Sequence, residues 1–171
     1  VDEVNRRDAR HIITIEDPLE YDHPNRRSLV EQIEIGKDAP TFAAALRSAL
    51  RQDPDVILVG EIRDAETMSM ALTAAETGHL ILSTLHTTSP AQTIHRIVDL
   101  FPSTQQNQIY KQTALSLHAI LNQKLIPRAD GRGIVPAVEL LLANPAVRNQ
   151  IRHAKLEGLA ATNKRKKLGA L

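Results

Sequence analysis

One short apolar run bounded by acids constrains the fold more than any other feature of this 171-residue chain. Residues 53–64 read DPDVILVGEIRD, so four branched residues lie between an Asp-Pro-Asp entry and a Gly-Glu exit. Such a run is typical of a strand in a parallel sheet that is covered on both faces. Glu61 is then expected at the carboxyl end of the strand, where open α/β sheets bind ligands. Together with Arg63 and Asp64, it is a candidate for holding a metal-bound phosphate or orienting water.

A second β-branched run, residues 11–15, also ends in acids. Glu16, Asp17 and Glu20 follow it, and Pro18 stops the strand and fixes the turn. Carboxylates that arrive from two strands allow one acid to support bound Mg²⁺ while another polarises water. Each acidic cluster taken alone is equally compatible with a solvated loop, but two acid-tipped strands favour a shared site.

Residues 79–89, which read HLILSTLHTTS, predict a third buried strand with a polar tip. Thr84, His86 and Thr87 at this tip are suited to sensing a γ-phosphate, because their hydrogen bonds exist only while the phosphate is attached. His79 stands at the strand entrance, more than about 20 Å from His86 on an extended segment. A structural and a functional role for His79 remain equally open at this point.

The remaining periodicity predicts helices that alternate with strands. Helical spacing covers residues 41–50, 64–77, 89–100, 103–122 and 145–155, an edge strand covers 28–35, and a hairpin joins 124–127 to 133–142. This alternation predicts a doubly wound α/β domain with a largely parallel sheet flanked by helices. We expect one domain over residues 1–155, in which residues 1–100 hold the acids and residues 101–155 form a helical and hairpin part. Residues 156–171 are expected to be a basic, flexible tail.

Composition excludes several classes of protein. The formal net charge is +1 and the chain contains two Phe, two Tyr and no Trp, which gives no case for nucleic-acid binding. There is no Cys, so disulfides and thiolate metal sites are excluded. No apolar run approaches the roughly 20 residues that span a bilayer, and we expect a water-soluble chain.

Three sequence blocks, in order, resemble the Asp box, Walker B and His box of the secretion ATPase superfamily. They are TIEDPLEY at residues 14–21, LRSALRQDPD running into VGEIRDAET at 46–67, and GHLILSTLHTT at 78–88. The resemblance covers roughly residues 9–155. It implies a RecA-like motor domain that binds ATP and Mg²⁺, assembles as a hexameric ring, and works against an inner-membrane pilus or secretion platform protein.

The resemblance also implies roles for individual residues. By this similarity Glu61 is the Walker B acid and the Asp-box acids Glu16, Asp17 and Glu20 assist water activation and magnesium binding. His79 and His86 belong to the His box, which couples nucleotide state to movement. Mg²⁺ would be held indirectly by Glu61 and Asp17, and nucleotide would be contacted by Arg63, Thr84, His79 and Thr87.

The branch of the superfamily is indicated by two further features. Extension and type II secretion motors commonly carry a four-cysteine zinc module, and this chain has no Cys. PAVRNQIR at residues 145–152 resembles an element of twitching-motility retraction motors, with departures at Val147, Gln150 and His153. We therefore expect a pilus retraction ATPase. An extension or secretion motor, and a non-catalytic ring-assembly subunit, remain the alternatives.

The phosphate-binding loop of this superfamily, Gly-x-x-x-x-Gly-Lys-[Ser/Thr], is absent from residues 1–171. In the superfamily this loop precedes the Asp box, and the first residue here is Val1. We therefore expect the C-terminal portion of a motor ATPase, which alone hydrolyses ATP poorly or not at all. Loss of the upstream strand and helix is also expected to leave a sheet edge and an apolar surface uncovered.

Overall fold

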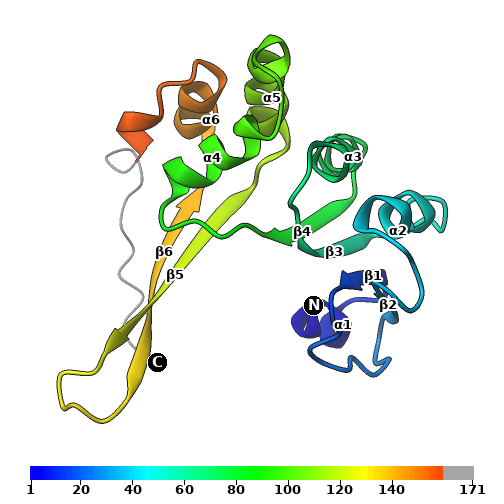
Figure 1. Ribbon diagram of the computed structural model, residues 1–171. Helices are drawn as coiled ribbons and strands as arrows, with labels where there is room; N and C mark the ends of the chain where they lie inside the picture. Colours follow the sequence, from blue (N-terminus) through cyan, green and yellow to red (C-terminus); the bar gives the residue numbers. More distant parts are fainter. Residues whose placement is uncertain (160–171) are drawn as a thin grey trace. The chain divides into compact units, whose positions relative to one another are not determined.

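The computed structural model describes residues 1–159, and the chain divides into two units, Val1–Leu85 and His86–Leu171. The first unit is a parallel sheet with helices, and the second is a β-hairpin with helices (Figure 1). The predicted α/β class with a largely parallel sheet flanked by helices is confirmed. The division between the units follows Leu85, whereas the sequence predicts the change from the acid-bearing part to the helical and hairpin part at residue 100.

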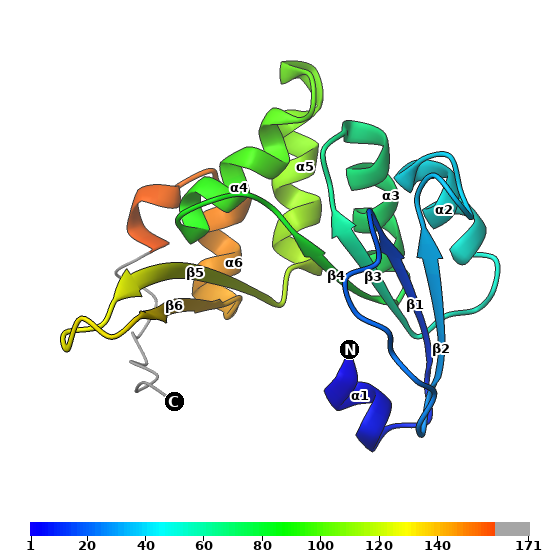
Figure 2. The same ribbon diagram turned by 60° about the horizontal axis from the view of Figure 1, so that its bottom comes forward.

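The first unit is built on four parallel strands in the order β2-β1-β3-β4 (Figure 2). The strands are β1 (His11–Glu16), β2 (Leu29–Glu34), β3 (Val56–Glu61) and β4 (Leu80–Thr84). Their registers are continuous from β1 to both neighbours, with Ile15 opposite Ile33 in β2 and Val59 in β3. Because all four strands run the same way, their carboxyl ends meet at one edge of the sheet.

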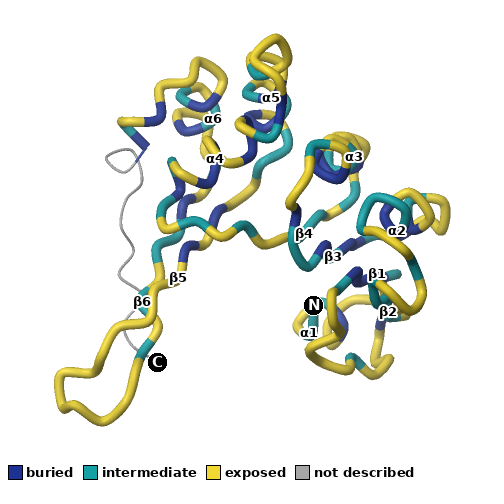
Figure 3. The backbone as a smooth tube through the Cα atoms, in the orientation of Figure 1, coloured by how far each residue is buried: buried dark blue, intermediate teal, exposed yellow. Residues whose placement is uncertain are grey.

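The two inner strands are buried on both faces. Ile12 and Ile13 of β1 are both fully buried, although successive strand residues point to opposite faces. Val56, Ile57 and Val59 of β3 are buried in the same way, and Figure 3 shows both strands largely in the buried colour. The interpretation of residues 56–59 as a doubly covered strand is therefore correct.

The strand β4 differs from its prediction as a buried strand over residues 79–89. It has five residues, and Leu80 at its start is 40% exposed. The physical reason is its position: within the part of the chain that the structure describes, β4 pairs with β3 alone and is the last strand of the sheet. An outermost strand has a bare edge, as the sequence analysis expects.

Two helices, α2 (Phe42–Ala49) and α3 (Ala65–Glu76), pack together on one face of this sheet (Figure 1). Both begin where the sequence predicts, because Thr41 and Asp64 accept hydrogen bonds from backbone N–H groups in the first turn. A short helix, α1 (Asp2–Arg7), precedes β1.

The second unit consists of four helices and one antiparallel hairpin. These are α4 (Pro90–Asp99), α5 (Ser103–Ser116), β5 (Ala119–Pro127), β6 (Ile134–Leu142), α6 (Pro145–Arg152) and the 3₁₀ helix η1 (Leu156–Gly158). Their common core is a cluster of apolar residues, namely Ile94, Ala114, Ile120, Leu141, Val147, Ile151, Leu156 and Leu159.

Three predicted boundaries in this unit are wrong. The helix predicted over residues 103–122 ends at Ser116, because Leu117 is extended and the next apolar residues alternate between buried and exposed, as in a strand. The last helix ends at Arg152 rather than near Lys155. The first hairpin strand, β5, begins at Ala119 rather than at the predicted Lys124. The second strand, β6, and the connection around residues 130–131 are close to where the sequence places them.

The predicted tail begins later than residue 156. Leu156 and Leu159 are buried in the apolar cluster, so the first residues after α6 belong to the folded unit. The basic run at residues 164–167 lies outside the described residues.

One face of the hairpin is apolar and exposed. The side chains that share this face include Leu121 and Leu125 of β5 and Ile134, Val138 and Leu142 of β6, which are 36–65% exposed. Figure 3 shows the outer half of the hairpin almost entirely in the exposed colour. Across residues 1–159, every helix is too short or too polar to cross a bilayer.

Candidate functional site

The carboxyl edge of the four-stranded sheet gathers acidic side chains from neighbouring strands. Glu34, Glu16 and Glu61 are the last residues of β2, β1 and β3, which lie side by side in this order. Glu16 and Glu34 are register partners. The expectation that Glu16 and Glu61 stand at one sheet edge is therefore correct, and the edge also receives a third glutamate.

The carboxylate of Glu16 is oriented by two neighbours. Its Oε1 atom accepts a hydrogen bond from Thr14 Oγ1 at 2.7 Å and lies 3.4 Å from the Gln32 Nε2 donor. Thr14 is fully buried inside β1, so its hydroxyl is a fixed donor. These two contacts hold the Glu16 carboxylate in a fixed orientation at the end of β1.

Glu61 is held close to the sheet, and Arg63 folds back onto it. The Glu61 side chain is 15% exposed, and its Oε1 atom forms an ion pair with the Arg63 guanidinium, whose side chain is 72% exposed. An exposed guanidinium beside a largely buried carboxylate has open space to turn towards a phosphate bound at this edge.

Gly60 brings β1 and β3 unusually close at this edge. A Cβ atom at this position would lie 3.2 Å from the Ile15 carbonyl oxygen and 3.5 Å from Glu16 Cα. The pairing with β4 also shifts here, so Gly60 forms a β-bulge before Glu61. Thr84 Oγ1 donates to the Gly60 carbonyl oxygen at 2.5 Å, which fixes the predicted phosphate-contacting threonine beside Glu61.

The other two predicted acids lie in the loop after β1. Asp17 and Glu20 are exposed and belong to residues 17–28, which form neither helix nor strand. This loop starts at the carboxyl edge, since it follows Glu16 directly. Both side chains are free to approach a ligand from solvent.

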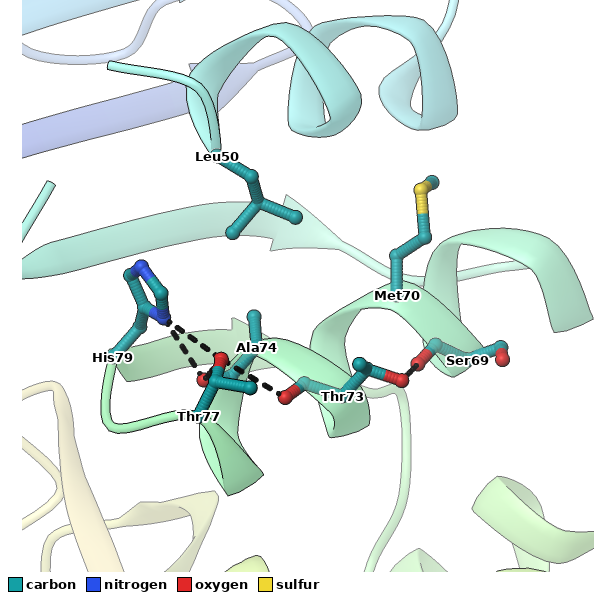
Figure 4. Close-up of a pocket in the computed structure, with 7 residues that line it drawn as sticks. All are labelled: Leu50, Ser69, Met70, Thr73, Ala74, Thr77 and His79. Carbon is teal, nitrogen blue, oxygen red and sulfur yellow. Dashed lines mark hydrogen bonds between the residues drawn. The ribbon is translucent and has the colours of Figure 1, made fainter. Parts of the chain in front are cut away.

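His79 lies at the opposite edge of the sheet, before the first residue of β4. Its backbone N–H donates to the Ala74 carbonyl oxygen at 3.1 Å, and its Nδ1 atom lies 3.0 Å from the same oxygen and 3.2 Å from Thr77 Oγ1 (Figure 4). With Gly78 at a φ of 106°, these contacts terminate α3 as a Schellman motif does. Within this unit, His79 and Glu61 do not share a site.

His86 and Thr87 belong to the second unit. Thr87 Oγ1 is 2.8 Å from Thr93 Oγ1 in α4, and the Asn122 side chain of β5 donates to the Thr87 carbonyl oxygen at 3.2 Å. These bonds fix the backbone directly after the exposed His86. Thr87 is therefore an anchor inside its own unit as well as a predicted phosphate contact.

Sequence reasoning missed two polar residues on β2 and one on β1. Glu34 completes the row of strand-end acids, although Lys37 Nζ donates to it at 2.8 Å. Gln32 and Thr14 both contact Glu16. The available signals were a polar residue inside the branched run of β1 and the alternation of β2, which places Gln32 and Glu34 on one face.

The acids at this edge fit an indirect Mg²⁺ site. Among residues 1–159, no three His, Asp or Glu side chains form a group that could hold a metal ion unaided. Mg²⁺ in nucleotide sites keeps several waters and is bound through one or two carboxylates plus substrate phosphates. Glu16 and Glu61 on adjacent strands supply oxygen ligands suited to that shell.

Comparison with known proteins gives consistent matches. The chain is 52% identical to a twitching motility protein of Neisseria gonorrhoeae. This match spans 153 residues and covers 90% of this chain and 41% of the relative. It is also 49% identical to the type IV pilus retraction ATPase PilT of Pseudomonas aeruginosa. This match spans 156 residues and covers 91% of this chain and 45% of the relative. The chain therefore spans less than half the length of these two relatives.

A solved structure agrees with the sequence matches. The crystal structure of the pilus retraction motor PilT with bound ADP superimposes with a TM-score of 0.89 at 52% identity, covering 94% of this chain and 47% of that one. The family model described as type II/IV secretion system protein matches residues 1–169. On this match, and on the order of the three sequence blocks, the chain belongs to the type II/IV secretion system protein family.

Proposed function

We propose that this chain is the C-terminal part of an ATP-hydrolysing motor that retracts a type IV pilus. The observation that carries the proposal is the delivery of Glu16 and Glu61 by adjacent parallel strands to one sheet edge. In the proposed reaction Glu61 orients and polarises the attacking water and, with Asp17, holds the Mg²⁺ shell indirectly, while Glu16 assists both tasks. Bound Mg²⁺ would neutralise the phosphate charge that develops during transfer.

The residues around the two acids have supporting roles in the proposal. Arg63, now paired with Glu61, would turn to the phosphate when nucleotide enters. Thr84 and Thr87 would contact nucleotide, and His86 would sense the γ-phosphate. Glu20 would approach from the loop. His79, which the resemblance assigns to nucleotide contact, would serve that role through a neighbouring subunit, since it lies away from Glu61 in its own.

The assembly and location are also part of the proposal. We infer a homo-oligomeric, hexameric ring that acts in the cytoplasm at the bacterial inner membrane on a pilus platform protein. The family covers type II and type IV secretion system proteins, and the likeness to the pilus retraction motor PilT supports retraction. The 171-residue chain alone is proposed to be inactive, because it lacks the phosphate-binding loop.

ATP hydrolysis by the full-length protein, beside the same protein with Glu61→Gln, tests this function. We expect turnover by the unmodified protein and a loss of about 10²–10⁴-fold in the variant, because the amide cannot accept a proton from water. ATP affinity is expected to persist. Glu76→Gln, an exposed glutamate at the end of α3, is the matched control and is expected to leave turnover unchanged.

Two results would redirect the assignment. If the full-length protein binds ATP and neither it nor the variant hydrolyses it, the chain belongs to a non-catalytic ring subunit. If hydrolysis is intact but deletion of the protein abolishes secretion while pili still retract, the motor serves secretion. Turnover by the 171-residue chain alone would contradict the proposed dependence on the missing loop.

A further inference from the structure

The loop of residues 17–28 has no regular structure, yet it carries Asp17 and Glu20. A loop of this kind leaves its backbone donors and acceptors unpaired unless side chains or water satisfy them. The positions of its acids therefore depend on whatever side chains bind its backbone. Two carboxamides do so, and they divide the loop between them.

Gln32, a half-buried residue of β2, holds the first part of the loop. Its Nε2 atom donates to the Tyr21 carbonyl oxygen at 2.9 Å, and its Oε1 atom accepts from the His23 backbone N–H at 2.8 Å. A single planar amide thus binds the backbone on both sides of Asp22. The turn that follows Glu20 is fixed to the sheet by this one side chain.

Asn5, a fully buried residue of α1, holds the second part. Its Nδ2 atom donates to the Pro24 carbonyl oxygen at 2.8 Å, and its Oδ1 atom accepts from the Arg26 backbone N–H at 3.1 Å. The chemistry is the same as that of Gln32. The difference is that residues 24–27 contain no acid, so Asn5 organises backbone without positioning a candidate catalytic group.

Gln32 has one further contact, which Asn5 does not share. The same Nε2 atom that binds Tyr21 lies 3.4 Å from Glu16 Oε1, the carboxylate at the end of the adjacent strand. Because both contacts use the single Nε2 atom of a rigid, planar amide, a rotation of this side chain changes its bonds to Tyr21 and to Glu16 together. Gln32 therefore connects the strand-end acid to the acidic loop.

We infer that Gln32 is a positioning residue for ATP hydrolysis, one that sets the acidic loop relative to Glu16; this inference rests on the proposed function. It acts through Glu16 and through the backbone of residues 21–23, without touching nucleotide itself. Misplacement of a catalytic group by about 1 Å can cost up to about a hundredfold in rate. Loss of Gln32 is therefore expected to affect the chemical step more than nucleotide binding.

The test compares Gln32→Leu, Gln32→Glu and Asn5→Leu in the full-length protein. Hydrogen exchange of residues 17–27 reports whether each amide holds its part of the loop. Steady-state ATP hydrolysis then separates kcat from KM. The two leucine variants are matched, because each removes one carboxamide that binds two backbone groups.

For Gln32→Leu we expect faster exchange at residue 23, a fall in kcat of about tenfold, and a KM for ATP within about twofold, because an interaction that matters in the transition state is lost. Asn5→Leu is expected to speed exchange at residue 26 and to lower thermal stability, with kcat within about twofold. A purely structural role for Gln32 would instead give the same kinetics in both leucine variants.

Gln32→Glu tests the Nε2 donor group separately from the Oε1 acceptor. It also provides a second variant in case Gln32→Leu does not fold. The carboxylate keeps the bond from the His23 N–H, removes the donor to Tyr21, and brings like charge towards Glu16. We expect residue 23 to remain protected while kcat falls at least about threefold, since like charges at this distance repel. An unchanged kcat in this variant would overturn the inference.

The outcomes also separate this inference from the proposed function. If Gln32→Leu frees the loop and kcat is unchanged while Glu61→Gln abolishes turnover, the motor assignment stands and the positioning role fails. Unchanged exchange at residue 23 in Gln32→Leu would likewise overturn the inference. If the full-length protein does not hydrolyse ATP, the proposed function fails, whatever the exchange at residue 23 shows for Gln32.

Discussion

The two edges of the four-stranded sheet use their polar groups differently. At the amino edge, Asp55 accepts from the His11 backbone N–H and from Arg10, both at 2.8 Å, and His79 closes α3. At the carboxyl edge, acids end three adjacent strands: Thr14 and Gln32 contact Glu16, and the exposed Arg63 side chain pairs with Glu61. The amino edge links elements together, whereas the carboxyl edge keeps charge available for a ligand. The same sheet therefore separates stability from chemistry along its strand direction.

Substitution of an acid at the carboxyl edge is expected to have a larger effect than any substitution at the amino edge. The effect is expected on ATP turnover rather than on stability. Glu16→Gln in the full-length protein is expected to lower kcat by about a hundredfold, because the amide is no base and a poor Mg²⁺ ligand. Thermal unfolding is expected to remain nearly unchanged. Steady-state ATP hydrolysis and melting curves measure the two effects.

Glu34→Gln is the matched control for that experiment. Glu34 ends the adjacent strand and already pairs with Lys37, so we expect kcat to change by less than about threefold. Equal losses in Glu16→Gln and Glu34→Gln would show that the edge acts through its total charge, and the distinction between individual acids would then be wrong.

At the amino edge, His79→Ala is expected to lower stability and to leave nucleotide binding unchanged. The ring contacts to Ala74 and Thr77 are lost, which is expected to lower the free energy of unfolding by about 1 kcal/mol. Nucleotide affinity of an isolated full-length subunit is expected to stay the same. Chemical denaturation and nucleotide titration check both, and His95→Ala on the exposed face of α4 is the control.

A loss of nucleotide affinity in His79→Ala without loss of stability would contradict the separation of the two edges. A loss confined to the assembled ring would instead place His79 in a neighbouring subunit's site, as proposed. The comparison therefore needs both the isolated subunit and the ring.

The smallest expected effect is a pH dependence of stability at the amino edge. The His11 backbone N–H, together with Arg10, holds the pKa of Asp55 below its ordinary 3.8. A carboxyl whose pKa is lowered by folding contributes stability above about pH 4, and this contribution is lost as the pH falls through the folded-state pKa. Because the side chain is 38% exposed, we expect less than about 1 kcal/mol.

The free energy of unfolding of the unmodified chain and of Asp55→Asn, measured at intervals between about pH 2.5 and 6, gives this contribution. The range extends to both sides of the ordinary pKa of the carboxyl group. The unmodified chain is expected to be more stable than the variant at pH 6, with the difference shrinking below about pH 4. A difference that grows as the pH falls would contradict the assigned direction of the pKa shift.

The parts of the fold that were predictable share a local cause. Residues 56–59 form a strand because a branched run needs burial on both faces, and Thr41 and Asp64 begin helices because their side chains accept from the first turn. The pairing of Glu16 with Glu61 at one edge followed from two such strands being parallel. None of these inferences required knowledge of distant contacts.

The parts that were missed depend on contacts between distant residues. Residues 117–122 fit both a helical and an alternating pattern, and the choice is made by pairing with residues 139–142 of β6. Gln32 reads as a solvated residue of an edge strand until the path of the loop after β1 is known. His79 likewise gains its role from the end of α3, which its position before a strand does not reveal.

The absence of a side chain at Gly60 lets the backbones of β1 and β3 approach closely beside two candidate catalytic acids. Any side chain there would press on the β1 backbone beside Glu16, so the spacing of the two strands at this point depends on a residue that is not an acid. Exchanging an acid alters the chemistry while leaving this dimension intact. A designer who wished to widen the site for a larger ligand would therefore begin at the residue that has no side chain.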